Sequence, residues 1–334
     1  MKPSTIIAAA ALSCCLHAAA QQQSQTMNTR DIYIRDPFIL PVEKTRTYYM
    51  YSTQSVKNEA GHDVGGVKVY KSKDLKTWTG PVQVCQLPET NWSAGAIWAP
   101  EVHRYKGKYW LFATINSDIE WKKPVSGWPA YIWRGTQIFK SDSPEGPFLP
   151  ISRHQQTPLD QMALDGTLWV ENGQPYMIYC HEWVQTADGT VNALPLSSDL
   201  SHATGSPQML FTGSAATWST GNNHGSGFPR AYITDGVFLY RTKTGRLLMI
   251  WSSYCDGQYA TGIAESVTGN VAGPWRQQPQ TLFRQDGGHA MIFRTFDGQL
   301  ALVLHQPNSG GRERAHIYKL EDTGESLRLG EEMK

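Results

Sequence analysis

Acidic residues at recurring positions are the groups of this chain that could do chemistry. Asp36, Asp165 and Asp235 each stand directly before Pro or Gly at the start of a short apolar segment, and Glu101 and His289 occupy comparable places in two other segments. A single Asp before Pro or Gly is usually a turn residue. Three of them in phase with a repeat indicate a shared site, in which one carboxyl group delivers a proton while another, ionised, activates water. Hydrolysis of a glycosidic bond requires such a pair.

A fivefold repeat must position these residues. Each copy opens with a short apolar segment, turns on a Gly or a charged pair, and returns as a second apolar segment that is mostly rich in aromatic residues. The copies cover residues 36–51, 99–112, 165–179, 235–251 and 289–304. An outer element follows each hairpin, so that each unit supplies about four strands. Five units predict an all-β fold, a five-bladed β-propeller that forms one domain over residues 31–334. The rival all-β folds, a sandwich or a jelly roll, do not predict five phased copies.

The predicted propeller would bring distant acids together. The first strand of each blade lines the central axis, so the starts of all five first strands lie at one mouth of the tunnel. Asp36, Asp165 and Asp235 should therefore gather there with Glu101 and His289. Several carboxyl groups in one concave, aromatic-lined pocket raise at least one pKa, because like charges and loss of water both oppose ionisation.

The bulk composition narrows the partners and the compartment. The chain has 334 residues, a formal net charge of +1 and 18% charged residues, so no surface of one sign should attract nucleic acid or an anionic membrane. Residues 1–20 are typical of a signal peptide cleaved after Ala20, and residues 21–30 of a disordered spacer. No later stretch approaches the ~20 apolar residues of a membrane-spanning helix. We expect an exported protein, periplasmic or extracellular, and a lipid anchor on Cys14 is the less favoured alternative.

Five motifs in order make the chain resemble glycoside hydrolase family 43, whose five-bladed propellers include arabinofuranosidases, arabinanases and xylosidases. The motifs are Arg35-Asp36-Pro37-Phe38, Trp98-Ala99-Pro100-Glu101-Val102, Leu164-Asp165-Gly166-Thr167, Asp235-Gly236-Val237-Phe238-Leu239-Tyr240 and Gly288-His289-Ala290-Met291. The resemblance implies that Asp36 is the general base, that Asp165 tunes the pKa of the acid and orients the sugar, and that the reaction is a single inverting displacement. It also implies a plant cell-wall oligosaccharide or polysaccharide as the partner. Such a reaction requires no cofactor.

The general acid is where the chain departs from the family pattern. Asp235-Gly236-Val237 stands where the family has Glu-Gly-Pro, and the Asp side chain is one methylene shorter than Glu. Glu182 follows the returning strand of the third unit, has the right length, and has Trp183 as an aromatic neighbour that would desolvate it. We therefore favour Glu182 as the acid, with Asp235 as a substrate ligand or a further pKa modulator. In the alternative, Asp235 is the acid and Glu182 binds a sugar hydroxyl or pairs with Arg230.

Further residues are expected to hold the sugar. Trp98 and Trp183 are the candidates for stacking on sugar rings, and Glu101, Arg230 and His289 are the candidates for polar contacts. A structural calcium ion with a largely water-filled shell could also bind at His289. A structural histidine that is hydrogen-bonded in the tunnel explains the same residue equally well.

Two other functions fit parts of this pattern. A non-catalytic sugar-binding propeller would share the aromatic residues, but binding alone does not need an acidic ring. A retaining propeller enzyme acting on fructosides would need its two carboxyl groups ~5 to 5.5 Å apart, against ~6.5 to 9.5 Å for inversion. Residues 117–133 and 221–230 should wall the pocket, which favours cleavage of a terminal sugar. The residues do not choose between L-arabinofuranose and D-xylose, and the resemblance favours an α-L-arabinofuranoside.

Overall fold

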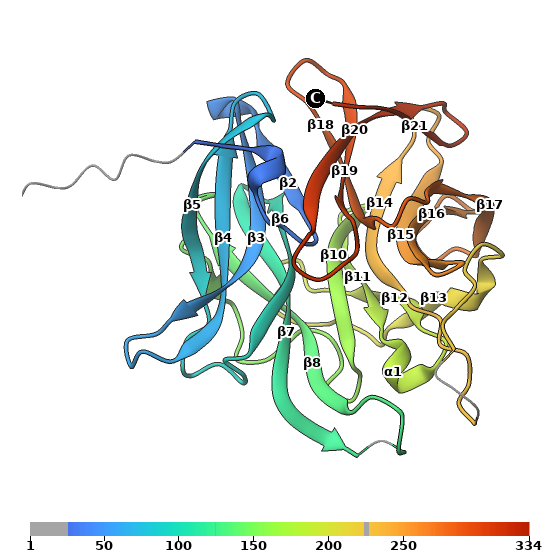
Figure 1. Ribbon diagram of the computed structural model, residues 1–334, viewed down its shortest axis with the longest axis horizontal. Helices are drawn as coiled ribbons and strands as arrows, with labels where there is room; N and C mark the ends of the chain where they lie inside the picture. Colours follow the sequence, from blue (N-terminus) through green and yellow to red (C-terminus); the bar gives the residue numbers. More distant parts are fainter. Residues whose placement is uncertain (1–25, 124, 224–226, 334) are drawn as a thin grey trace, which may run out of the picture.

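Five antiparallel sheets, arranged around their first strands, make up the protein (Figure 1). The structure is a computed structural model that describes residues 26–123, 125–223 and 227–333. Each sheet consists of consecutive strands, so that order along the chain is also order around the axis. The predicted five-bladed β-propeller is confirmed.

The first two blades contain the strands β1 to β9. Blade one has the spatial order β1-β5-β4-β3-β2 and consists of β1 (Met27–Asn28), β2 (Phe38–Val42), β3 (Thr47–Lys57), β4 (Asp63–Ser72) and β5 (Thr77–Gln86). Blade two consists of β6 (Ala96–Tyr105), β7 (Lys108–Lys122), β8 (Tyr131–Ser141) and β9 (Leu149–Pro150).

The other three blades each contain four strands in chain order. Blade three consists of β10 (Ala163–Glu171), β11 (Gln174–His181), β12 (Thr190–Pro195) and β13 (Gln208–Thr212). Blade four consists of β14 (Asp235–Arg241), β15 (Leu247–Cys255), β16 (Gln258–Ser266) and β17 (Trp275–Phe283). Blade five consists of β18 (Gly288–Arg294), β19 (Leu300–Gln306), β20 (Arg314–Asp322) and β21 (Leu327–Glu332).

Within residues 26–123, 125–223 and 227–333, helical structure is limited to single turns. These are the 3₁₀ turns η1 (Thr29–Asp31), η2 (Glu43–Thr45) and η3 (Gly213–Ala215) and the helix α1 (Trp183–Thr186). Across the described ranges, no helix combines the length and the apolar character needed to cross a membrane.

Local sequence explains the hairpins, and the pattern of apolar residues explains the core. Lys106-Gly107 and Asn172-Gly173 each have positive φ at both residues, which is the conformation of a tight two-residue hairpin turn. The buried apolar side chains form four clusters that lie between neighbouring blades. Because each sheet is covered by its neighbours on both faces, strands such as β15 and β19 are almost continuously buried.

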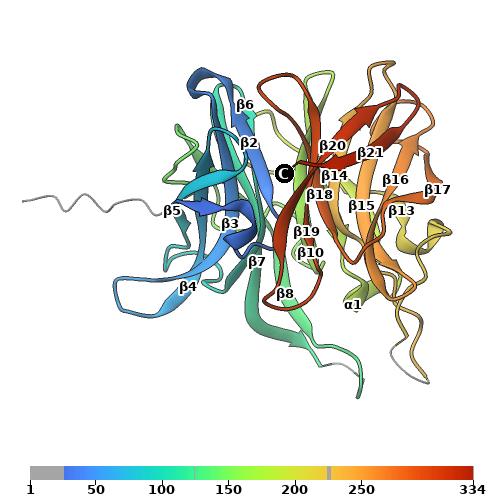
Figure 2. The same ribbon diagram turned by 45° about the horizontal axis from the view of Figure 1, so that its top comes forward.

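The first blade packs against the last and closes the ring. Figure 2 shows β2 beside β18, and the two strands are in contact. Tyr33 forms an isolated antiparallel bridge with Arg314, and the Ile34 N–H donates to the Glu313 carbonyl oxygen at 3.2 Å. The side chains of Arg35 and Glu313 also pair, with Nη1 3.0 Å from Oε1.

The segment before β2 differs from the prediction. Residues 21–30 were expected to form a disordered spacer, but Met27–Asn28 pairs with β5 and Arg30 forms an ion pair with Glu332. These backbone and side-chain partners are far away in the sequence, so the pattern of neighbouring residues could not reveal them. The predicted signal peptide, 1–20, and Cys14 lie outside the described residues.

Each innermost strand has one residue with left-handed backbone where it begins. The five residues are Asp36, Ala99, Asp165, Gly236 and His289, with φ of 52°, 43°, 55°, 51° and 51°. In blades two to five the strand register shifts at this point, because two residues of the inner strand face one residue of its partner. Such bulges re-aim side chains. The repeat therefore sets five equivalent side-chain positions around the axis.

Side chains of the preceding blade hold several of these left-handed residues. The Asp165 N–H donates to Thr114 Oγ1 at 2.9 Å, and the His289 N–H donates to Ser252 Oγ at 2.9 Å. The Asp36 N–H donates to His305 Nδ1 at 3.2 Å. Each bond joins two blades at the end of the tunnel where the innermost strands begin.

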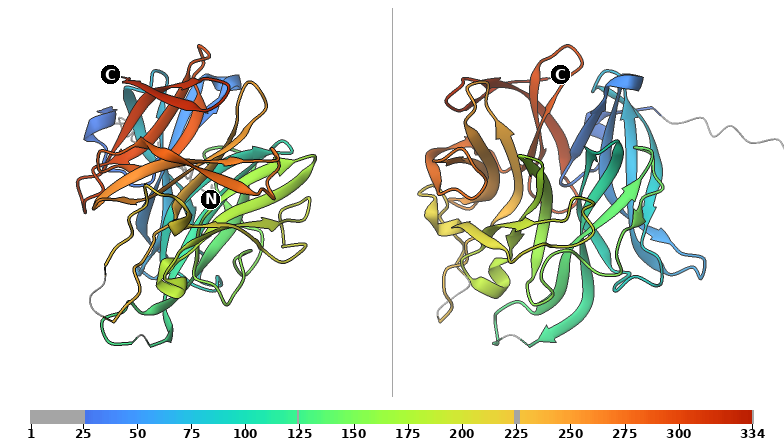
Figure 3. Two further views of the ribbon diagram at one scale, coloured as in Figure 1. Left: turned by 90° about the vertical axis from the view of Figure 1, so that its right-hand side faces the viewer. Right: turned by 180° about the vertical axis from the view of Figure 1, so that it is seen from behind.

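One long hairpin rises beside this end. The β7–β8 hairpin and the segment between β13 and β14 extend beyond the other strand ends (Figure 3). The Trp128 ring on the hairpin stacks on Phe228 at 5.5 Å between ring centroids, and Trp128 Nε1 donates to the Val184 carbonyl oxygen in α1 at 2.7 Å. These contacts form a wall on one side of the opening.

Candidate active site

A cavity of about 380 Å³ lies where the innermost strands begin. Seven of the predicted site residues line it: Asp36, Trp98, Asp165, Glu182, Trp183, Asp235 and His289. The other lining residues are Arg35, Thr53, Leu164, Asn222, Ile233, Tyr254 and Tyr259. The five blades thus bring acids more than a hundred residues apart into one pocket.

Two predicted substrate ligands lie elsewhere. Glu101 is buried beside the cavity rather than in its wall, and its Oε2 lies 2.9 Å from His103 Nε2. Arg230 is exposed, and its Nη1 donates to the Thr220 carbonyl oxygen at 2.5 Å. Neither side chain is among those that line the cavity. The bulge register explains Glu101, since two residues separate it from Trp98, the residue of the same strand that does reach the cavity.

Asp235 is one residue out of phase with Asp36 and Asp165. The left-handed residue of blade four is Gly236, so Asp235 corresponds to Arg35, Trp98 and Leu164 in the other blades. The three Asp residues look equivalent in the sequence, because each precedes Pro or Gly. We call the five left-handed residues the inner ring and the residues directly before them the outer ring. Asp235 belongs to the outer ring, whereas Asp36 and Asp165 belong to the inner ring.

Gly236 is required where the two rings meet. A Cβ atom at this position would lie 2.7 Å from Cα and Cγ of His289, and the left-handed backbone adds strain for any L side chain. The Gly236 N–H donates to Asp165 Oδ2 at 3.0 Å. The glycine thus allows blade five to approach blade four and fixes the Asp165 carboxylate at the same time.

His289 lies between the two carboxylates of the inner ring. Its Nδ1 is 3.2 Å from Asp36 Oδ1 and 3.7 Å from Asp165 Oδ2. His305, on β19 of the same blade as His289, also approaches Asp36, with its Nδ1 3.2 Å from Oδ1. All four side chains are buried or nearly so, which strengthens their electrostatic coupling.

These surroundings separate the pKa values of Asp36 and Asp165. Burial alone would raise the pKa of Asp36, but the charge of His289 and the hydrogen bond and charge of His305 hold it well below its usual range. Burial and the negative charge of Asp36 raise the pKa of Asp165 well above its usual range, against the Gly236 hydrogen bond. Asp36 is therefore suited to accept a proton, and Asp165 is not.

Asp235 and Glu182 are the two groups that could donate a proton. Burial and the charge of Asp165 raise the pKa of Asp235 to about 7, against His289 and a hydrogen bond that Tyr259 Oη donates to Asp235 Oδ2 at 3.0 Å. Burial raises the pKa of Glu182 to about 7, against the charge of Arg134. Both carboxyl groups can hold a proton near neutral pH.

Arg134, on β8, is a site residue that the sequence analysis missed. Its Nη1 lies 2.6 Å from Glu182 Oε2, and the two side chains are only 9% and 11% exposed. Its guanidinium also lies over the Trp98 ring, 4.7 Å from the centroid. Arg134, and not the predicted Arg230, is thus the partner of Glu182. No motif surrounds Arg134 in the sequence, and only the pairing of blades two and three brings it to Glu182.

Tyr254 and Tyr259 are further lining residues without a sequence motif. They lie at the turn of the β15–β16 hairpin, and their ring centroids are 5.4 Å apart. Their place next to the β15–β16 turn could have indicated them, because this turn lies at the same end of the blade as the start of β14.

The described residues contain no group of three or more His, Cys, Asp or Glu side chains arranged to hold a metal ion. His289, the residue considered as a ligand, has its Nδ1 facing two carboxylates. The donor set does not indicate a cation site, and a structural calcium ion stays a prediction.

Comparisons with known proteins agree with this geometry. The family model "Glycosyl hydrolases family 43" matches residues 31–328. A solved structure described as an endo-arabinase from Bacteroides thetaiotaomicron VPI-5482 is 39% identical, covers 88% of this chain and 96% of that chain, and has a TM-score of 0.76.

Two curated proteins are also similar. The "Putative beta-xylosidase" of Escherichia coli (strain K12) is 26% identical over 265 residues, and the match covers 72% of this chain and 44% of that protein. The "Extracellular endo-alpha-(1->5)-L-arabinanase 1" of Bacillus subtilis (strain 168) is 36% identical over 58 residues, which are 16% of this chain and 18% of that protein. The chain spans less than half of the length of either curated relative.

Proposed function

Because the chain belongs to glycosyl hydrolases family 43, we propose that it hydrolyses α-L-arabinofuranosyl linkages of plant polysaccharide, outside the cytoplasm, by inversion. The observation that carries the mechanism is the single cavity in which Asp36 is held ionised while Asp235 keeps a proton near neutral pH. The 39% identical endo-arabinase supports the choice of sugar. The name of the Escherichia coli relative is the reason to keep β-D-xylosyl linkages as the alternative.

In this proposal Asp36 is the general base. Its carboxylate takes a proton from a water molecule as the water oxygen attacks the anomeric carbon, and the glycosidic C–O bond breaks on the opposite face. The general acid gives its proton to the departing oxygen in the same step. His289 keeps Asp36 ionised, and burial keeps the acid protonated.

We assign the acid to Asp235 rather than to Glu182, which the sequence analysis favoured. Arg134 stabilises the ionised form of Glu182 through a buried contact of 2.6 Å, so a proton on Glu182 would compete with this pair. Burial is the main cause of the raised pKa of Asp235, and His289, the Tyr259 hydroxyl and Arg35 offset it only in part. Glu182, with Arg134 and Trp98, is better suited to bind sugar hydroxyls and a ring face, and Trp183 borders the same part of the cavity.

The wall formed by Trp128 and Phe228 supports release of terminal units. Trp128 also donates to the carbonyl oxygen of Val184, the residue after Trp183 in the cavity lining, and in this proposal the wall restricts the passage of a longer chain on that side. Cleavage within the chain is the second candidate, which the description of the 39% identical relative favours.

The first experiment measures products and leaving-group dependence. Debranched arabinan and aryl pentosides are incubated with the wild type, with Asp235→Ala and with Glu182→Ala, and the anomeric configuration of the first product is followed by NMR. We expect free arabinose with inverted configuration. Asp235→Ala should lose roughly 10²- to 10⁴-fold in kcat on arabino-oligosaccharides, but far less on an aryl arabinoside whose leaving group needs little protonation.

Glu182→Ala is the matched variant. A ligand role predicts a raised KM and similar losses on both substrates, whereas selective loss on the oligosaccharide would make Glu182 the acid. Mixed oligosaccharides as early products would establish internal cleavage. Retention of configuration, or no turnover on any pentoside, would contradict the proposed function.

A further inference from the structure

His305 differs from the residues at the same position of blades two and four. At the position that accepts the backbone N–H of the next blade's left-handed residue, blades two and four have the hydroxyl groups of Thr114 and Ser252. Blade five has a histidine, although a hydroxyl would serve the Asp36 N–H as well. The imidazole adds a contact that no hydroxyl could make, because its ring lies against Tyr259. Its Nδ1 is also 3.2 Å from Asp36 Oδ1, and the protonated ring can donate to that oxygen in place of accepting the N–H.

The His305 and Tyr259 rings are stacked. Their centroids are 5.6 Å apart with an interplanar angle of 15°. The far end of Tyr259, its Oη, donates to Asp235 Oδ2 at 3.0 Å. Both rings are almost fully buried, so neither can leave its position without opening a cavity. One stacked pair therefore contacts the proposed base through one ring and the proposed acid through the other.

Neighbouring residues hold the pair from behind. Asn308 Oδ1 lies 3.3 Å from His305 Nε2, and Asn308 Nδ2 donates to Tyr254 Oη at 2.9 Å. The Tyr254 ring in turn packs against Tyr259, which completes a closed circuit of four side chains. Gly288 makes room for it, because a Cβ there would lie 2.6 Å from the Tyr259 ring.

We propose that the stacked His305–Tyr259 pair is a spacer that sets the separation between Asp36 and Asp235. Both are positioning residues, and the proposal rests on the proposed roles of the two carboxyl groups. Inversion needs ~6.5 to 9.5 Å between base and acid so that water fits between the base and the sugar. Because each ring is anchored to a different carboxyl group, disturbing either ring moves both groups relative to each other.

Two variants of Tyr259 separate this role from a local one. Tyr259→Phe keeps the ring and loses the hydroxyl, whereas Tyr259→Leu keeps much of the apolar volume and loses the stack. Each is assayed on the oligosaccharide and on the activated aryl glycoside that the wild type hydrolyses. We expect Tyr259→Phe to lose about tenfold in kcat on the oligosaccharide but to stay within about threefold on the aryl glycoside, since only the acid is disturbed. Tyr259→Leu should lose roughly ten- to a hundredfold on both, with KM nearly unchanged, because Asp36 also shifts.

The control is the stacked His316–Tyr318 pair, whose two residues both lie on β20 of blade five. Their ring centroids are 6.5 Å apart with an interplanar angle of 16°, and neither residue lines the cavity, so Tyr318→Leu should leave kcat unchanged.

If Tyr259→Leu does not fold, His305→Asn tests the same coupling from the other side. It retains a polar group near Nδ1 and removes the stack. The spacer predicts a larger loss on the oligosaccharide than on the aryl glycoside, although His305 itself contacts Asp36 and not Asp235.

Equal effects of Tyr259→Phe and Tyr259→Leu on the aryl glycoside would overturn the spacer while leaving the proposed function intact. Equal losses of His305→Asn on both substrates would do the same. A wild type that hydrolyses no glycoside would overturn both proposals together.

Discussion

Asp36 and Asp235 show how the same side chain acquires opposite proton affinities. Both carboxyl groups are buried, which by itself favours the neutral form of each. Asp36 contacts two histidines and stays ionised, whereas His289 and the Tyr259 hydroxyl offset the burial of Asp235 only in part, so that Asp235 keeps its proton to about pH 7. The burial is common to both, so the identity of the neighbours decides the difference.

The pH dependence of the reaction should follow from these two groups. A general acid with a raised pKa works while protonated, so kcat/KM should fall as pH rises through about 7. A general base with a lowered pKa stays ionised in moderate acid, so the acidic limb should lie below the ordinary range for Asp. The check is a profile of kcat/KM against pH on an oligosaccharide.

Asp235→Asn is the control for that assignment. On an aryl glycoside with a good leaving group, this variant should lack the alkaline limb while it keeps the acidic one. An alkaline limb that persists in Asp235→Asn and disappears in Glu182→Gln would transfer the acid role to Glu182.

At the scale of the strand, the bulge that begins each innermost strand is the element that aims the side chains. Its left-handed residue was not apparent in the sequence, because Asp, Ala, Gly and His occupy the same position. The Asp-Pro and Asp-Gly pairs suggested a common phase that holds for Asp36 and Asp165 and fails by one residue for Asp235. A shift of one residue sends a strand side chain in a different direction. The Asp-Gly pattern therefore placed Asp235 in the same ring as Asp36 and Asp165, whereas the structure has Gly236 there.

Gly236→Ala tests the bulge of blade four. The added Cβ would meet His289, and the residue would keep an unfavourable φ, so we expect the free energy of unfolding to fall by roughly 2–4 kcal/mol. The activity should fall as well, because His289 and the Asp165 hydrogen bond are displaced. Chemical denaturation and kcat provide the two measurements.

Gly245→Ala is the matched control for this effect. Gly245 also has positive φ, at 92°, but no atom lies within 4 Å of a Cβ placed there. It lies in the β14–β15 turn, at the end of the blade away from the cavity. A loss of roughly 1 kcal/mol without a change in kcat is expected. Equal losses of stability and activity in both variants would show that backbone strain alone, and not the approach of blade five, matters at Gly236.

At the scale of the whole molecule, the ring closes without a strand shared between the first and last blades. Each sheet contains only its own consecutive strands, so closure depends on the packing of β2 against β18 and on the contacts of residues 33–35 with residues 313 and 314. Glu313 is the buried member of this group, with 1% of its side chain exposed, and it pairs with Arg35 beside the cavity. Closure of the propeller and formation of the site therefore depend on the same contacts.

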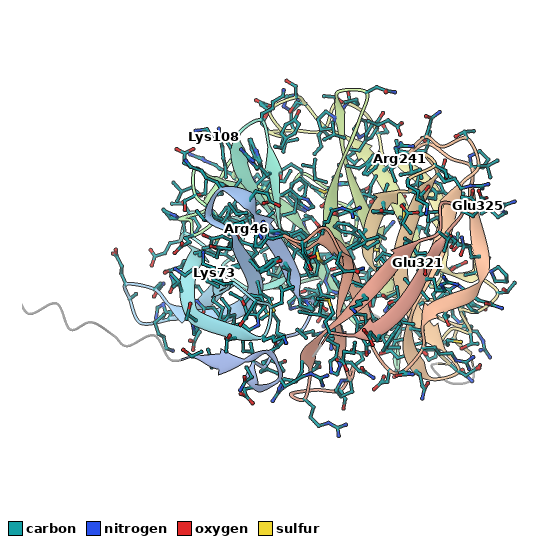
Figure 4. The ribbon with its side chains drawn as sticks, turned by 90° about the horizontal axis from the view of Figure 1, so that it is seen from above. Arg46, Lys73, Lys108, Arg241, Glu321 and Glu325 are labelled. Carbon is teal, nitrogen blue, oxygen red and sulfur yellow. The ribbon has the colours of Figure 1, made fainter. Side chains whose placement is uncertain are left out.

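Glu313→Ala should weaken closure. We expect the free energy of unfolding to fall by about 1–3 kcal/mol, because a buried charge-assisted hydrogen bond is lost while Arg35 keeps some solvent and the nearby Asp36. Glu321→Ala is the control in the same blade, since Glu321 lies on the surface of β20 (Figure 4) and its ion pair with Arg328 is exposed. That variant should change stability by less than about 0.5 kcal/mol. Equal effects in a denaturant titration would show that the Arg35–Glu313 pair does not contribute to closure.

The sequence by itself determined the fold class, because five phased hairpins with tight Gly turns have few other ways to bury their apolar faces. It also determined that Asp36, Asp165, Asp235, Glu182 and His289 share a site, since the starts of equivalent strands must meet at one end of a propeller. The tertiary structure alone decided the partners. Arg134 reaches Glu182 and His305 reaches Asp36 through contacts between blades, and Tyr259 reaches Asp235 within blade four. No local pattern encodes these contacts. Proton affinities depend on such neighbours within a few ångströms, and for that reason the assignment of the acid changed once the blades were in place.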